Sequence, residues 1–227
     1  AMPVMLTRVI RAIIFDLDGT LVHSLSGIAK ALNTILECHQ LPTHNESTVR
    51  TFIGDGIVKL VERACPDAYD PEQIAELTGA VSDEYSSAWQ GGTVPYTGVN
   101  ETLTALLQRK TKIAVLSNKP HAFCQKITDL IFPDITFTAV IGQHQGVPTK
   151  PDPAGALDLA RRLDVSPEQI AFVGDSTVDI ATAHNAGMIS VAATWGYHDL
   201  PDLISESPTH QIDSIDKLLD ILDNQAP

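Results

Sequence analysis

The sequence predicts an α/β fold, a doubly wound parallel sheet with an inserted helical domain, from three observations. Short apolar runs rich in β-branched residues recur along the chain, and helical periodicity fills most stretches between them. One long stretch, from about Ser24 to Gln90, has helical periodicity only. Because continuous apolar runs fit strands that are buried on both faces, their alternation with helices predicts βαβ units and a parallel sheet.

The predicted core strands share a short apolar run that ends at a turn containing glycine or polar residues. They are Val9–Phe15, Ile113–Leu116, Phe137–Ile141, Ile170–Val173 and Ile189–Ala193. The predicted core helices share apolar residues spaced three or four apart. They lie around Val99–Leu107, Ala156–Leu163 and Ile215–Leu222.

The helical stretch predicts a second domain that interrupts the core after its first strand. Two apolar stripes run from Leu25 to Ile35 and from Ile57 to Ala64, and a third helix is expected over Pro71–Trp89, with proline at its start. A loop-like stretch, Gly91–Tyr96, follows. We therefore expect a core of residues 1–21 plus 96–227 and a helical domain of residues 22–95.

The amino-acid composition limits the classes of partner and the cellular compartment that are expected for this protein. The 227 residues include 15 basic and 28 acidic side chains, a formal net charge of −13 without any basic run, which argues against nucleic acid. No apolar run approaches the roughly 18 residues that span a bilayer. The N-terminal residues Ala1–Leu6 do not resemble a signal peptide, and three cysteines without CxxC spacing favour a reducing compartment. We expect a cytoplasmic protein, a monomer or small homo-oligomer, without a membrane partner.

Polar side chains follow the predicted strands where they end. They are Asp16 and Asp18, Ser117 and Asn118, and Asp175, Ser176 and Asp179, with Lys150 in a loop before a predicted helix. Since ligands bind at the carboxyl ends of strands in an open parallel sheet, these residues are expected to converge on one edge.

This set of side chains predicts phosphoryl transfer. Packed carboxylates repel each other unless a cation intervenes, and a hard divalent ion such as Mg²⁺ suits oxygen ligands. Ser117 and Lys150 can hold phosphate oxygens. Asp16 can act as a nucleophile that forms an aspartyl-phosphate, and Asp18 can protonate the leaving alkoxide and then activate water.

Each piece also has an ordinary structural interpretation. Asp16–Thr20 can be a turn that ends a strand, Asp175 or Ser176 a helix N-cap, Lys150 a solvated lysine and Ser117 a turn hydroxyl. The combination, with each piece in order and next to a strand end, favours the functional interpretation.

These residues resemble the four motifs of the haloacid dehalogenase (HAD) superfamily of phosphohydrolases. The motifs are Asp16–Leu21, Ser117–Asn118, Lys150–Pro151 and Gly174–Asp179, and the helical insert resembles the small cap domain of that family. The resemblance implies a Rossmann-like core with Asp16 as nucleophile and Asp18 as acid/base. It also implies Mg²⁺ held by Asp16, the Asp18 carbonyl and Asp175 with Asp179 in support, and phosphoryl binding by Ser117, Asn118 and Lys150.

Within the superfamily, the sequence is most similar to phosphoglycolate phosphatases. The similar segments are Gly54–Ala64, Pro95–Val99, Ser117–Pro120 and Thr194–Tyr197. The cap must then supply selectivity: backbone N–H groups at Gly54, Asp55 and Gly56 can approach a small anion, and Arg63 can pair with a substrate carboxylate. The sequence differs from the pattern of these phosphatases at two places, which bears on the substrate. His23 stands where relatives commonly carry an acidic residue, and Gly142–Gln145 lacks the acidic residue expected after the glycine.

The leading hypothesis is a Mg²⁺-dependent phosphatase for a small phosphoester, with 2-phosphoglycolate favoured. Enzymatic alternatives are a pyrophosphatase, a sugar-phosphate phosphatase or a phosphosugar mutase of the same superfamily. The non-enzymatic alternative is a phosphoacceptor signalling module, which also uses an acidic Mg²⁺ site, an acceptor Asp, a hydroxyl and a Lys. The inserted domain and Asp18 argue against that module.

Overall fold

The computed structural model describes residues 9–224, and the expected absence of a signal peptide concerns residues outside that range. A six-stranded sheet forms the centre, in the order β5-β4-β1-β6-β7-β8, and every neighbouring pair is parallel. The strands are β1 (Ala12–Phe15), β4 (Lys112–Pro120), β5 (Ala139–Gln143), β6 (Ile170–Gly174), β7 (Ile189–Ala193) and β8 (His210–Ile212). The predicted fold class is confirmed.

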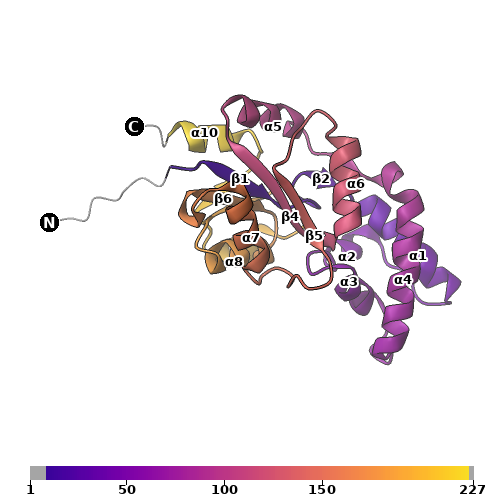
Figure 1. Ribbon diagram of the computed structural model, residues 1–227. Coiled ribbons are helices and arrows are strands. Elements are labelled where there is room, and N and C mark those ends of the chain that lie inside the picture. The colour runs from indigo at the N-terminus through magenta and orange to yellow at the C-terminus, as the bar shows by residue number, and fades with distance from the viewer. Residues whose placement is uncertain (1–8, 225–227) are drawn as a thin grey trace.

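Helices cover both faces of this sheet (Figure 1). On one face lie α5 (Val99–Gln108), α6 (His121–Ile131) and α10 (Lys217–Asp223), and on the other α7 (Ala154–Leu163), α8 (Thr177–Asn185) and α9 (Leu200–Ser205). Alternate residues of β1 enter two hydrophobic clusters: Ile13 and Phe15 join the first set of helices, whereas Ala12 and Ile14 join α7 and α8. This explains why the strand is apolar throughout.

The remaining α-helices gather at one end of the sheet (Figure 1). They are α1 (Leu25–Cys38), α2 (Glu46–Arg50), α3 (Ile57–Ala64) and α4 (Pro71–Ala88), followed by a 3₁₀ turn at Trp89–Gly92. Leu32, Leu60 and Leu77 belong to a hydrophobic cluster that these helices share. The α4 helix begins as expected, with Pro71 in its first turn and Asp70 as N-cap in a capping box.

Two short strands join the helical segment to the sheet. β2 (Val22–His23) and β3 (Val94–Pro95) pair antiparallel, with Val22 opposite Pro95 and His23 opposite Val94. The stretch Gly91–Tyr96 is thus not simply a loop, because it contains a 3₁₀ turn and β3. Along residues 9–224, no helix is both long and apolar enough to cross a membrane.

Candidate active site

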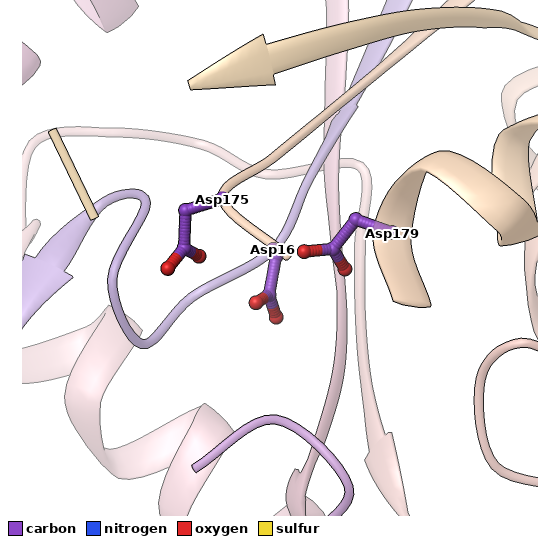
Figure 2. Close-up of side chains that lie close together, drawn as sticks. All are labelled: Asp16, Asp175 and Asp179. Carbon is purple, nitrogen blue, oxygen red and sulfur yellow. The ribbon is translucent and has the colours of Figure 1, made fainter. Parts of the chain in front are cut away.

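Three buried carboxylates meet at the carboxyl end of the central strands. Asp16 follows β1, Asp175 follows the adjacent β6, and Asp179 lies in the first turn of α8. One oxygen of each lies within 4.8 Å of the others, and their side chains point toward a common space (Figure 2). We call these three residues the acidic cluster.

Contacts with neighbouring residues fix the position of the Asp175 carboxylate beside Asp16. The Thr20 hydroxyl donates to Asp175 Oδ1 at 2.9 Å, and the Tyr197 backbone N–H donates to Asp175 Oδ2 at 2.7 Å. Gly19 has φ +84°, and a Cβ there would lie 2.3 Å from Asp175 Oδ2, so only glycine fits this turn.

Asp179 is held by the residue that starts its helix. Ser176 is the N-cap of α8, as its ordinary interpretation predicted, and its hydroxyl donates to Asp179 Oδ2 at 2.6 Å. The Ser176 backbone N–H donates to the same oxygen at 3.0 Å. The hydrogen bonds between Ser176 and Asp179 that cap α8 therefore also hold the Asp179 carboxylate in place.

Lys150 reaches the acidic cluster from its loop. Its Nζ lies 2.6 Å from Asp179 Oδ1 and 3.0 Å from Asp16 Oδ1. Burial alone would lower the pKa of Lys150, but the carboxylates of Asp16 and Asp179 raise it above its ordinary value. The side chain is therefore an ammonium at neutral pH.

One ammonium does not balance three carboxylates. Burial raises the pKa of Asp16 to about 6, opposed by Lys150 and reinforced by Asp179. Burial, followed by repulsion from Asp16 and Asp179, raises the pKa of Asp175 well above its usual range. Asp16 Oδ1 is also buried without a well-formed hydrogen bond. Buried oxygen donors with excess negative charge fit a hard divalent cation.

Asp18 makes contacts outside the acidic cluster. It accepts a hydrogen bond from the Ser24 hydroxyl at 2.5 Å, and its two oxygens lie 3.1 and 3.0 Å from Lys119 Nζ. The Lys119 ammonium is also 3.0 Å from the Tyr85 hydroxyl of α4. Burial opposes the charge of Lys119, but Asp18 and Tyr85 raise its pKa above the ordinary value.

An irregularity in β4 presents Ser117, Asn118 and Lys119. Leu116 pairs with Ile141 of β5, yet Pro120 pairs with Gln143, so β4 has two extra residues here. Ser117 lines the pocket described below. The Asn118 side chain donates to the carbonyls of Gly54 and Lys150 and accepts from the Lys150 backbone N–H.

A pocket with an empty volume of about 650 Å³, including its open mouth, connects these groups with the helical segment. Asp16, Asp18, Ser117, Asn118 and Lys119 line its sheet side. Apart from Tyr85, its other residues are apolar or glycine, including Ile28, Gly54, Gly56, Ile57, Leu60 and Phe123. The sheet side thus supplies the charged and polar groups, and the helices supply an apolar wall.

The predicted cap residues divide into two groups. Gly54 and Gly56 line the pocket, and at Gly56, with φ +91°, a Cβ would lie 3.0 Å from Gln143 Oε1. Arg63 instead pairs with Asp55 at 2.5 Å and donates to the Phe52 carbonyl at 3.1 Å. Neither Asp55 nor Arg63 is among the pocket-lining residues.

Sequence reasoning missed several contacts of this site. In the sequence, Lys119, Thr20 and Tyr197 stand out only as members of the similar motifs and segments, and Tyr85 has no predicted role, because their partners lie far along the chain. His23, in β2, packs edge-on against Tyr96 and Tyr197, with ring centroids 5.8 and 6.1 Å away. His23 also pairs with Val94 of β3 and is therefore part of the connection between the sheet and the helical segment.

Comparison with known proteins places the chain in a family. The family model described as "Haloacid dehalogenase-like hydrolase" matches residues 13–193. The chain belongs to this family. Phosphoglycolate phosphatase 1 of Pseudomonas aeruginosa is 34% identical to this HAD-like hydrolase over 230 residues, which cover 100% of the chain and 85% of the relative. The phosphoglycolate phosphatase of Salmonella typhimurium is 34% identical over 233 residues, covering 94% and 92%.

A solved structure supports the same conclusion. The crystal structure of a predicted phosphoglycolate phosphatase from Haemophilus somnus has a TM-score of 0.86 at 32% identity, covering 93% of this chain and 97% of that one. These matches confirm the expected superfamily, its fold and the enzyme class, a phosphatase. Such an enzyme acts on a small phosphorylated substrate.

Proposed function

We propose that this protein is a Mg²⁺-dependent phosphatase that hydrolyses 2-phosphoglycolate to glycolate and phosphate through an aspartyl-phosphate on Asp16. The observation that carries the proposal is the position of Asp16. Its carboxylate lies beside Lys150 and two further carboxylates, and it lines a pocket that Asp18 also lines. The names of the similar proteins support the substrate.

The proposed reaction has two steps. A carboxylate oxygen of Asp16 attacks phosphorus, the bond to the ester oxygen breaks, and Asp18 gives that oxygen a proton. Asp18 then takes a proton from water, whose oxygen attacks the phosphorus of the aspartyl-phosphate. This releases phosphate, restores the Asp16 carboxylate and returns to Asp18 the proton that it gave in the first step. Ser117 and Lys150 bind the phosphoryl oxygens, while Asn118 holds the backbone of Lys150 in place.

The acidic cluster is proposed to hold the metal. Asp16, Asp175 and the backbone carbonyl of Asp18 would be ligands, and Asp179 would support them from its contact with Lys150. When bound, Mg²⁺ supplies positive charge that offsets the cluster and the phosphoryl group. Its fit rests on the excess negative charge and on the poorly bonded Oδ1 of Asp16.

The division into domains is part of the proposal. Residues 22–95 would form a cap, and residues 1–21 with 96–227 the core, with β2 and β3 as the hinge. Closure of the cap would exclude bulk water, and opening would release product. Gly54 and Gly56 let the backbone approach the substrate at the start of α3, which has no side-chain cap, and the Asp55–Arg63 pair stiffens that loop.

The test is phosphate release from a panel of small phosphoesters, with Mg²⁺ and with EDTA, and with Asp16→Asn as control. The panel holds 2-phosphoglycolate, pyrophosphate, sugar phosphates and nucleoside monophosphates. We expect fast, metal-dependent release that strongly favours 2-phosphoglycolate and is lost in Asp16→Asn. Preference for another ester would keep the mechanism and reject the substrate. No release from any ester would reject the proposal and favour a phosphoacceptor.

A further inference from the structure

The pocket beside Asp18 is lined by one cation among the residues that the structure describes. Among the described residues that line the pocket, Lys119 alone has a positively charged side chain. The side chain is only 6% exposed, so its charge acts in a poorly hydrated place, where electrostatic interactions are strong. Lys150, the other ammonium of the site, contacts Asp16 and Asp179 and is assigned to the phosphoryl group.

The surroundings of Lys119 explain why its charge is available to a ligand. Its Nζ contacts both oxygens of Asp18 at similar distances, 3.1 and 3.0 Å, and thus shares one carboxylate in two contacts. The third polar contact is the Tyr85 hydroxyl at 3.0 Å, and the Tyr85 ring lies 4.5 Å from Nζ. Giving up one Asp18 contact frees an N–H while the other contacts keep the ammonium in place.

We propose that Lys119 recognises a second anionic group on the substrate, a carboxylate on the leaving-group side, and is the main specificity-determining residue of this site. Tyr85 holds Lys119 from the cap side. The carboxylate takes over one of the contacts between Lys119 and Asp18, so substrates with this anion both bind and loosen Asp18 for its proton transfers. The inference rests on the proposed function and assigns its substrate class: phosphoesters of small hydroxy acids.

The geometry favours Lys119 over the cap arginine for this role. Arg63 has its guanidinium against Asp55 at 2.5 Å and does not line the pocket. Lys119 lies next to Asp18, where the ester oxygen must be during proton transfer, so an anion one carbon away from that oxygen is within its reach. The apolar residues around it, among them Ile28 and Phe123, would penalise an unpaired carboxylate.

The experiment compares two substrates that differ in one group: 2-phosphoglycolate and 2-hydroxyethyl phosphate, whose leaving alcohol carries no carboxylate. We expect Lys119→Met to lower kcat/KM for 2-phosphoglycolate by about 100-fold, the loss of one buried charge-assisted hydrogen bond. Loss of the contact between Lys119 and Asp18 affects both substrates, so the decisive quantity is the ratio of the two kcat/KM values, which should fall by about 30-fold. Tyr85→Phe, which removes one hydroxyl only, should lower the preference by about tenfold. Lys30→Met, at an exposed lysine of α1, is the matched control.

The outcomes separate this inference from the proposed function. Equal losses for both substrates in Lys119→Met would indicate a merely structural role and overturn the inference. It is also overturned if Arg63→Met, and not Lys119→Met, removes the preference. A wild-type enzyme that hydrolyses both esters equally well keeps the phosphatase mechanism and rejects the anion site. A wild-type enzyme without phosphatase activity rejects both. If Lys119→Met does not fold, the Tyr85→Phe ratio decides.

Discussion

Asn118 shows how one side chain connects three parts of the site. Its amide joins β4 to the loop at Gly54 and to both backbone groups of Lys150, with distances of 2.8 to 3.1 Å. Replacing it by alanine leaves these buried groups without partners. We expect Asn118→Ala to lower the free energy of unfolding by about 2 kcal/mol. It should also reduce kcat/KM by about tenfold or more, because Lys150 is displaced.

The measurement is urea unfolding together with steady-state kinetics. Asn185→Ala is a matched control, because the exposed Asn185 makes a single amide hydrogen bond, to the Pro151 carbonyl at 2.9 Å. It should lose less than about 1 kcal/mol and retain its activity. An Asn118→Ala enzyme that is as active as wild type would contradict the role given to this residue.

Single residues also mark the limit of sequence reasoning. Asp16, Asp175, Asp179 and Lys150 could be predicted to converge, because parallel strands end at one edge. The contact of Lys119 with Tyr85 could not, since it depends on how a helix of the inserted segment lies over the sheet. Similarly, nothing in the sequence says that Arg63 is engaged by Asp55 rather than free.

At the scale of elements, the α4 helix carries Tyr85 and Val81 to the pocket and depends on its start for stability. Asp70 accepts hydrogen bonds from the backbone N–H groups of Glu72 and Gln73, at 3.0 and 2.9 Å. Asp70→Ala should therefore lower the free energy of unfolding by about 1 kcal/mol. Enzymatic activity should persist, because the N-cap residue Asp70 lies about four helical turns from Tyr85.

Thermal and urea unfolding measure this change in stability. Asp67→Ala serves as the control, because it removes a nearby carboxylate that is also exposed but is not a helix N-cap. A stability loss of the same size in both variants would show that net charge, and not capping, is responsible.

Most elements that the sequence does not indicate are short or poorly buried, although the sequence analysis also predicts no helix over α6, with 11 residues, or α8, with nine. β1 and β6 are buried along their whole length, and a continuous apolar run marks them. β8 has three residues with only Ile212 buried, and α2 has five with only Val49 buried. β2 and β3 have two residues each. Such short elements exist because of tertiary contacts, so no local pattern predicts them.

At the scale of the whole molecule, the proposed metal site would couple folding to metal binding through the acidic cluster. Without a metal, folding brings three carboxylates together in a buried place with one ammonium, which costs free energy. A cation that binds only the folded state stabilises it by about 2.7 kcal/mol at a hundredfold excess over Kd. For a chain of 227 residues we expect Mg²⁺ to raise Tm by about 5 to 10 °C.

Asp175→Asn tests this coupling. The amide can accept from the Tyr197 N–H and donate to the Thr20 hydroxyl, so both local contacts survive while one repelling charge is removed. The metal-free variant should be at least as stable as the metal-free wild type, yet Mg²⁺ should no longer raise its Tm. Differential scanning calorimetry with EDTA and with Mg²⁺ measures both effects, and Asp129→Asn, at an exposed position of α6, should respond like wild type. A full Mg²⁺ response in Asp175→Asn would remove Asp175 from the proposed ligands and place the metal elsewhere in the fold.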